Sequence, residues 1–169
     1  MNTEDISIQP AGFEDSPKIV KLIRTYPEAL ISRPISDIIQ NIDRILVAKK
    51  NGELVGVVSW KILPEMGSHL EPSVEIMSLA VHPDHKGQGI GSTLVHSVIE
   101  DHIRPLHPLQ IIALTFAPEF FKKFGFKETP KSELMHKIYM GCIHCTRYDS
   151  PFTCPEVAMT LRIHEAKEP

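Results

Sequence analysis

The segment SLAVHPDHKGQGIGSTLVHSVIE, residues 78–100, constrains the fold more than any other part of the sequence. An apolar strand runs into Pro, His and Lys, then into three glycines at alternate positions, and then into a helical pattern. Gly87, Gly89 and Gly91 let the chain bend tightly and bring bare backbone close to a ligand. A helix that starts there points its unpaired N–H groups and the positive end of its dipole at one place. The pattern therefore predicts a phosphate or pyrophosphate site, with a merely structural strand-to-helix turn as the alternative.

The glycine spacing excludes two other phosphate-binding loops. KGQGIG at 86–91 lacks the G-x-G-x-x-G spacing of dinucleotide-binding folds, and it lies in mid-chain rather than in an opening βαβ unit. No Gly-Lys-Ser/Thr follows it, which rules out a Walker A loop.

Composition limits the class of protein. With 169 residues the chain is long enough for one domain with a substantial core, so we expect a single domain over residues 1–169. A net charge of −3 argues against binding to nucleic acid or to a membrane surface. No apolar run approaches the ~20 residues needed to span a bilayer, and MNTEDISIQP is unlike a secretory signal. Three cysteines cannot all pair within the chain, which fits a reducing compartment, and we expect a cytoplasmic protein.

Apolar periodicity divides the rest of the chain into short elements. Before the glycine turn we expect, in order, a strand around Ile6 and Ile8, a helix capped by Ser16-Pro17, a helix from about Ser36 through Ile42, a hairpin around Asn51-Gly52, the loop HLEPS and the strand VEIMSLAV. From the turn onward we expect a helix from about Gly89 to Ile103, the strand PLQIIALTF, the helix APEFFKKF stopped by Gly125, a strand opening at Phe126, the last strand EVAMTLRI and a frayed end HEAKEP. This order predicts a mixed α/β, or α+β, fold in which helices flank a central sheet.

At LAVHPDHKGQGIGSTL the chain resembles the acyl-CoA-binding segment of the GCN5-related N-acetyltransferases (GNAT). FFKKFGF is similar to that family's later helix-then-Gly-Phe element, and the order of elements fits from Ile6 onward. Lys86 stands where the family usually has Arg or Gln, which is a mild departure. The resemblance implies the GNAT fold, with acetyl-CoA as co-substrate in the splay between the two central parallel strands.

The resemblance also implies which residues bind acetyl-CoA. Backbone groups from Leu79 to Val81 would hydrogen-bond the pantetheine arm as a short extra strand does, and amides from Gly87 to Ser92 would hold the pyrophosphate. The implied cofactor-binding set is Leu79, Ala80, Val81, Lys86, Gly87, Gln88, Gly89, Ile90, Gly91 and Ser92.

Acetyl transfer from a thioester to an amine requires a neutral amine, so a base must take a proton directly or through water. Glu75 is the candidate base, because in EIMSLAV it matches the glutamate with that role in histone-acetylating relatives. The alternative is a solvated glutamate at the start of a strand. Phe121 replaces the Tyr that usually protonates the leaving sulfur. Tyr139 and His136 are possible substitutes, and a CoA thiolate can also leave without an acid.

A narrower resemblance points to the acceptor. LISRPISDIIQNI, LVGVVSW, ALTFAPEFFKKFGF and LMHKIYMGCIHC are similar, in this order, to the short N-acetylglutamate synthases of bacterial arginine biosynthesis. The resemblance implies acetylation of L-glutamate by acetyl-CoA. That family often pairs through its C-terminal strands, so a homodimer is possible.

A glutamate substrate brings two carboxylates and needs cations. Arg33 is our first candidate, because a guanidinium can grip a carboxylate with two parallel hydrogen bonds; a surface role is its alternative. Lys137 and Arg147 are candidates for the other carboxylate, although an ordinary solvated role also fits each of them. Thr115, followed by Phe116, ends the strand beside the cofactor strand and would line the substrate pocket, with packing as the alternative.

The cysteines form a cluster in the sequence. Cys142, Cys145 and Cys154, with His136 or His144, have the composition of a Cys3His zinc set, but a second CxxC pair is missing. We therefore expect no metal and interpret these residues as free thiols, with zinc as the alternative.

Two alternatives to a glutamate acetyltransferase remain open at this point. The chain could acetylate another amino acid, a polyamine, an antibiotic or a protein N-terminus. It could also be a non-catalytic acyl-CoA sensor, a hypothesis whose one support is the missing Tyr at Phe121.

Overall fold

A tight hairpin lies at the start of the sheet in the computed structural model, which describes residues 6–63 and 72–164. Asn51 and Gly52 adopt left-handed φ values of 51° and 81°, as the two central residues of such a turn require. They join strand β2 (Ile45–Lys50) to the antiparallel strand β3 (Glu53–Leu63), which confirms the hairpin expected from the Asn-Gly pair.

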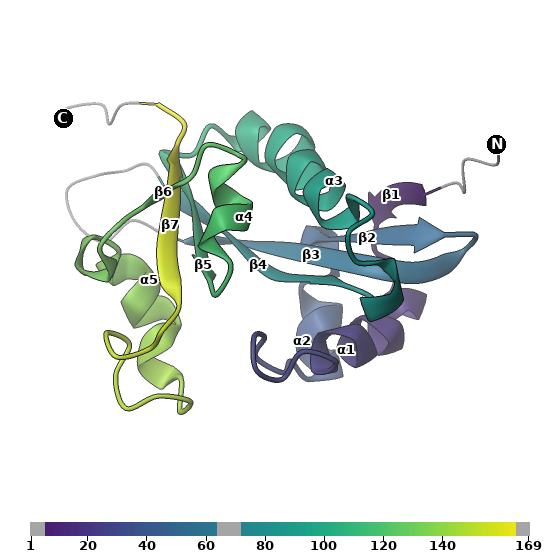
Figure 1. Ribbon diagram of the computed structural model, residues 1–169, viewed down its shortest axis with the longest axis horizontal. Coiled ribbons are helices and arrows are strands. Elements are labelled where there is room, and N and C mark those ends of the chain that lie inside the picture. Colours follow the sequence, from purple (N-terminus) through teal and green to yellow (C-terminus); the bar gives the residue numbers. More distant parts are fainter. Residues whose placement is uncertain (1–5, 64–71, 165–169) are drawn as a thin grey trace. The chain divides into compact units, whose positions relative to one another are not determined.

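The strands form one mixed sheet. Besides β2 and β3, its strands are β1 (Ile6–Pro10), β4 (Ser73–Val81), β5 (Gln110–Thr115), β6 (Lys127–Glu128) and β7 (Val157–Arg162). The strand order is β1-β2-β3-β4-β5-β7-β6 (Figure 1). β4 and β5 pair in parallel from Ser73 opposite Gln110 to Glu75 opposite Ile112, whereas β5 and β7 pair antiparallel. The predicted mixed sheet with flanking helices is confirmed.

The helices of the described residues are short. They are α1 (Ser16–Arg24), α2 (Ile35–Gln40), α3 (Ile90–Ser97), a π-helical segment (Val98–Ile103), α4 (Pro118–Lys122) and α5 (Met135–Met140). Single 3₁₀ turns lie at Phe13–Asp15, Ile42–Arg44, Pro83–His85, Arg104–Leu106, Lys131–Glu133 and Cys142–His144. None of these helices has the length and apolar character needed to cross a membrane.

Some expected boundaries were wrong. Asp15, not Ser16, occupies the cap position of α1, and Ser16 is the first helical residue. α2 ends before Ile42, because the side chain of Asn41 donates to the backbone oxygen of Asp37 at 2.8 Å. The helix expected from Gly89 to Ile103 changes from α to π at Val98. The loop predicted at 69–73 and the frayed end at 164–169 lie largely outside the described residues.

The chain folds as two compact units, and strands β3 and β4 contribute residues to both of them. The first unit comprises Met1–Trp60 and Ile76–Pro105, and the second comprises Lys61–Glu75 and Leu106–Pro169.

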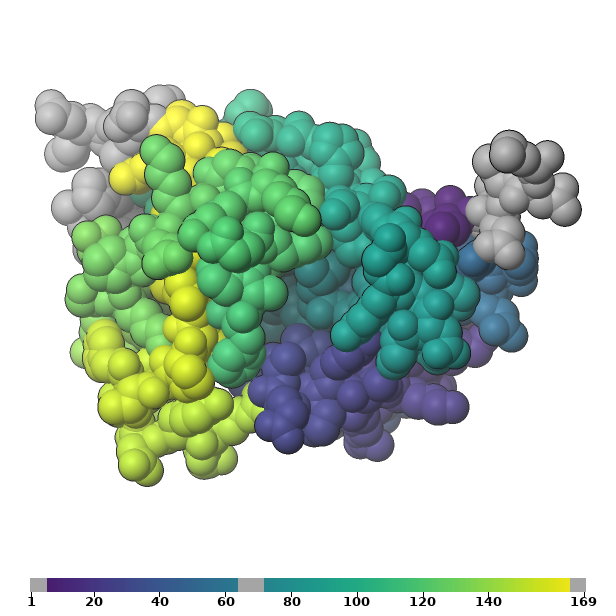
Figure 2. Space-filling model, viewed as in Figure 1, coloured from purple at the N-terminus to yellow at the C-terminus, as the bar shows by residue number. Residues whose placement is uncertain are grey.

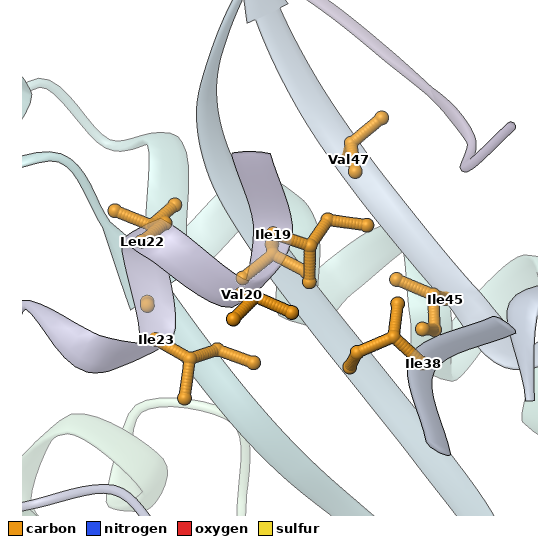
Figure 3. Close-up of a cluster of buried hydrophobic side chains, with 9 residues drawn as sticks. Ile19, Val20, Leu22, Ile23, Ile38, Ile45 and Val47 are labelled. Carbon is orange, nitrogen blue, oxygen red and sulfur yellow. The ribbon is translucent and has the colours of Figure 1, made fainter. Parts of the chain in front are cut away.

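In the first unit, helices cover both faces of the sheet (Figure 1). Ile19 and Ile23 of α1 and Ile38 of α2 meet Ile45 and Val47 of β2 in one buried cluster (Figure 3). Alternate residues of a strand point to opposite faces, so Ala48 belongs to the other face, where α3 packs. Gly56 permits close packing there, because a Cβ at Gly56 would lie 2.9 Å from Leu94 and 3.2 Å from the Cβ of Ala48.

The second unit has a separate core. Its buried cluster consists of Leu63 of β3, Ile112 of β5, Ala158 of β7 and Leu134, which directly precedes α5. Gly125 ends the turn after α4 with a φ of 86°, as expected from its place after the last helical residue.

A buried ion pair anchors the entry into α1. The Asp15 carboxylate is 2.9 Å from Lys49 Nζ and accepts the Gly12 N–H at 3.0 Å. Burial alone would raise the pKa of Asp15, but the Gly12 hydrogen bond and the Lys49 and Lys18 charges hold this pKa below its ordinary value of 3.8. A carboxyl whose pKa is lowered by folding stabilises the fold above its unfolded pKa, and this contribution is lost as the pH falls.

Asp15→Asn should lower the free energy of unfolding at pH 7 by about 1–3 kcal/mol, because it removes a charged hydrogen-bond partner of Lys49. The stability difference between variant and wild type should shrink as the pH falls below about 4. Urea unfolding between pH 3 and pH 7 measures both effects. Glu14→Gln, the same chemical change on an exposed neighbour, is the control; equal behaviour of the two variants would contradict the assignment.

Candidate functional site

The glycine turn leaves the start of α3 open. Gly87 and Gly89 have left-handed φ values of 76° and 80°, and a Cβ at either would meet no described heavy atom within 4 Å. Glycine is therefore favoured at both positions by backbone conformation rather than by crowding. Gly89 is the cap residue of α3, no side chain caps it within the described chain, and the first intrahelical bond runs from Thr93 N–H to Gly89 O. The N–H groups of residues 90–92 thus point beyond the helix end, which is the arrangement of an anion site.

Tyr26 connects this turn to β4. Its hydroxyl donates to the carbonyl oxygen of Val81 at 2.5 Å, and Lys86 Nζ lies 4.5 Å from the centre of its ring. Figure 2 shows the turn, in teal, beside the α1–α2 segment, in blue-purple. The sequence analysis missed Tyr26, since a single tyrosine after a helix carries no signal of its own.

The other residues expected around the turn lie on β4 or next to it. Ala80 is buried in the core of the first unit, while Leu79 and Val81 are half-buried. Gln88 accepts from Lys50 Nζ at 3.4 Å and donates to the Asp84 carbonyl oxygen at 3.5 Å. The first unit thus brings the whole predicted cofactor-binding set to the end of β4 and the start of α3.

Arg33 lies in the same unit and is firmly oriented. Its side chain is only 11% exposed, and its Nε donates to Asp37 at 2.5 Å. Nη1 donates to the hydroxyls of Ser59 at 3.2 Å and Ser78 at 3.4 Å. Ser78 adopts a left-handed φ of 53° within β4, which a non-glycine residue rarely does. Nη2 has no hydrogen-bond partner among the described residues, so it remains available to donate to an anion.

The second unit holds Glu75 and Lys137 in an ion pair. Oε1 of Glu75 is 2.8 Å from Lys137 Nζ, and the two side chains are 6% and 14% exposed. Oε2 of Glu75 is buried and has no hydrogen-bond partner among the described residues. Burial alone would lower the pKa of Lys137, but the Glu75 carboxylate outweighs burial and holds this pKa above 10.5. Lys137 therefore stays charged at neutral pH, and Oε2 is the oxygen of Glu75 that can still accept a hydrogen bond.

The remaining predicted residues of the second unit have structural partners. Phe121 is buried, with its ring edge-on to Phe120 and Phe126 at 5.3 Å and 5.4 Å between ring centres. The Thr115 hydroxyl accepts the Ala117 N–H at 2.9 Å, which stabilises the turn before α4. Of the two substitutes for the missing Tyr, Tyr139 is 50% exposed, whereas His136 is buried and lies 3.1 Å from the Ser73 hydroxyl.

The cysteines are free thiols. Cys142, Cys145 and Cys154 are all partly buried, and burial raises the pKa of Cys142 despite the nearby Lys137. Within residues 6–63 and 72–164, no group of three His, Cys, Asp or Glu side chains is arranged to hold a metal ion. The zinc alternative therefore finds no support in the described residues.

Comparison with known proteins agrees with this geometry. Residues 41–128, more than half of the chain, match the Acetyltransferase (GNAT) domain family. An uncharacterized N-acetyltransferase of Chlorobaculum tepidum is 27% identical over 161 residues, which is 94% of this chain and 97% of that protein. The amino-acid acetyltransferase of Mycobacterium tuberculosis is 27% identical over 143 residues, which is 84% of this chain and 79% of that protein.

A solved structure shares the fold. The N-acetylglutamate synthase of Neisseria gonorrhoeae, complexed with coenzyme A and N-acetyl-glutamate, superimposes with a TM-score of 0.75 at 24% identity. The match covers 95% of this chain but 36% of that one. At this identity the likeness establishes the fold alone.

Proposed function

The chain belongs to the GNAT acetyltransferase family, and from this premise we propose that it transfers the acetyl group of acetyl-CoA directly to the α-amino group of L-glutamate. The observation that carries the acetyl-CoA half of the proposal is the left-handed glycine turn at the open start of α3. The name of the Mycobacterium tuberculosis relative supports an amino acid as acceptor, and the oriented Arg33 supports an acceptor with a carboxylate.

The chain's own residues fit acetyl-CoA. The N–H groups of residues 90–92 would hold the pyrophosphate, and Lys86, whose Nζ lies over the Tyr26 ring, adds a positive charge to the same turn. Backbone groups from Leu79 to Val81 would bind the pantetheine arm, although Tyr26 already occupies one acceptor position of the Val81 carbonyl. Acetyl-CoA supplies an activated carbonyl carbon and a thiolate that leaves with the electron pair of the broken C–S bond.

Glu75 would act as the general base. The amine must lose a proton to attack, and Oε2 of Glu75 is a buried acceptor with no described partner. Native proteins rarely leave a buried carboxylate oxygen unsatisfied, so this atom is the natural place for the amine or a bridging water. Phe121 cannot donate a proton, so the proposed transfer proceeds without the usual acid.

Arg33 would bind a substrate carboxylate through Nη2. Asp37, Ser59 and Ser78 hold the guanidinium in one orientation, so little side-chain entropy is lost on binding. Lys137, one of the two cations considered for the other carboxylate, is already paired with Glu75. This pairing favours a second candidate, an acetyltransferase for amino acids more broadly, because one pre-oriented cation suffices for an α-carboxylate.

An acceptor screen that follows release of the CoA thiol separates these candidates. We expect L-glutamate to give the highest kcat/KM among glutamate, aspartate, glutamine, alanine and spermidine. If aspartate, glutamine or alanine matches glutamate, the broader amino-acid activity replaces the glutamate assignment. If spermidine matches them, a carboxylate is not recognised at all.

Arg33→Gln should lower kcat/KM for glutamate roughly 10- to 100-fold, since a charged hydrogen bond contributes about 1.5–3 kcal/mol. Most of the effect should appear in KM for glutamate, while the Kd of acetyl-CoA measured by calorimetry stays within a few-fold. Arg24→Gln, at the exposed end of α1, is the matched control. An unchanged KM for glutamate in the Arg33 variant would remove Arg33 from the acceptor site.

Glu75→Gln should slow acetyl transfer by roughly 10²–10⁴-fold, because an amide cannot accept the amine proton. Binding of acetyl-CoA should change little, which calorimetry can check on the same protein. Glu133→Gln, an exposed glutamate of the same unit, serves as control. A transfer rate equal to that of the wild type would exclude Glu75 as the base.

A further inference from the structure

Two consecutive residues of α5 contact alternate residues of β4. His136 lies 3.1 Å from the Ser73 hydroxyl, and Lys137 Nζ lies 2.8 Å from Oε1 of Glu75. Ser73 and Glu75 share one face of the strand, because alternate residues of a strand point the same way. The position of the Lys137 ammonium is thus set by two contacts between the same helix and strand.

The ion pair makes the two oxygens of the Glu75 carboxylate different from each other. Oε1 faces the ammonium, while Oε2 is buried and has no hydrogen-bond partner among the described residues. If Lys137 also bound a substrate carboxylate, its single positive charge would be shared between two carboxylates, and the buried Glu75 carboxylate would keep less of its counter-charge. Removing one partner of a buried ion pair is strongly unfavourable.

The other groups whose charge acts on Lys137 are acids. The titratable groups that interact with Lys137, besides Glu75, are Cys142 and Glu156. Burial raises the pKa of both groups, which favours their neutral forms. Lys131 interacts with Glu156, and its Nζ donates to the carbonyl oxygens of Pro151 and Cys154 at 2.9 Å and 2.7 Å.

We propose that Lys137 is a positioning residue for Glu75 and not a ligand for the substrate. Its ammonium holds Oε1, so that Oε2 is presented as the oxygen that accepts the amine proton. The role rests on the proposed function, in which Glu75 is the base. It does not depend on which amine is the acceptor.

Lys137→Met tests the role through the split between kcat and KM. We expect kcat to fall about 10- to 100-fold, with KM for the acceptor within about threefold. Lys137→Arg, which keeps the charge, should recover part of kcat. A KM raised more than tenfold with kcat unchanged would instead make Lys137 a substrate ligand and overturn the proposal.

A double-mutant cycle provides the decisive comparison. Added to Glu75→Gln, Lys137→Met should lower the remaining rate by less than about threefold, because it would act only through a carboxylate that is already absent. The double variant buries no unpaired charge, so it remains informative even if Lys137→Met alone unfolds; thermal melts of each variant verify the fold. Losses that multiply across the two sites would overturn the positioning role.

Controls separate this proposal from the function it rests on. Lys122→Met removes a lysine from a surface ion pair with Glu119 in the same unit and should leave kcat and KM unchanged. If the wild type acetylates an amine other than glutamate, the cycle is run with that amine, and only the glutamate assignment fails. If the wild type acetylates glutamate but the losses in rate multiply across the two sites, only the role of Lys137 fails. If no amine is acetylated, both proposals fail.

Discussion

The left-handed turn between β4 and α3 is the constraint on which the first unit depends. With Gly87 and Gly89 both at positive φ, the chain turns and enters α3 without a capping side chain. The helix then packs closely on the sheet because Gly56 has no side chain in its way. The same geometry leaves the first N–H groups of α3 unpaired. An open helix end of this kind is suited to an anionic ligand.

The second unit depends on a different interaction, the buried pair of Glu75 and Lys137. Two charges taken out of water are costly, and a well-packed apolar pair of the same size is often at least as stable. Retaining such a pair next to an unsatisfied carboxylate oxygen therefore has little value for stability. Under the proposed function its value is chemical, because the ammonium orients the buried carboxylate and leaves one oxygen to accept a proton.

The two candidate cations, Arg33 and Lys137, are each paired with a carboxylate. Arg33 is partly neutralised by Asp37 and steadied by two serine hydroxyls, and Lys137 is neutralised by Glu75. Each cation is thus pre-oriented, and the carboxylate beside it reduces its pull on anions in general. Under the proposed function, an acceptor would be selected by hydrogen-bond geometry at Nη2 of Arg33 more than by general attraction of negative charge.

Local sequence rules were sufficient to predict the structure where one or two residues determine the backbone conformation. Asn51-Gly52 specified a hairpin, Gly125 a helix end, and the glycines of KGQGIG a turn into a helix, because these conformations need positive φ wherever they occur. The family resemblance at the same segment extended this to the fold, while the cofactor-binding residues that it implies stay a prediction. α5 was missed because six residues are too few for a periodic signal, and such a helix is stabilised by what it packs against.

The sequence by itself therefore determined that a strand, the glycine turn and a helix follow one another at residues 78–100. It also determined the membership of the family and the candidate residues Arg33 and Glu75. Only the tertiary structure decided which side chains meet. It paired Lys137 with Glu75, placed Tyr26 under Lys86, and set Arg33 between Asp37 and two serines. Contacts between residues far apart in the chain depend on how whole helices pack on the sheet, and no local pattern of residues encodes that packing.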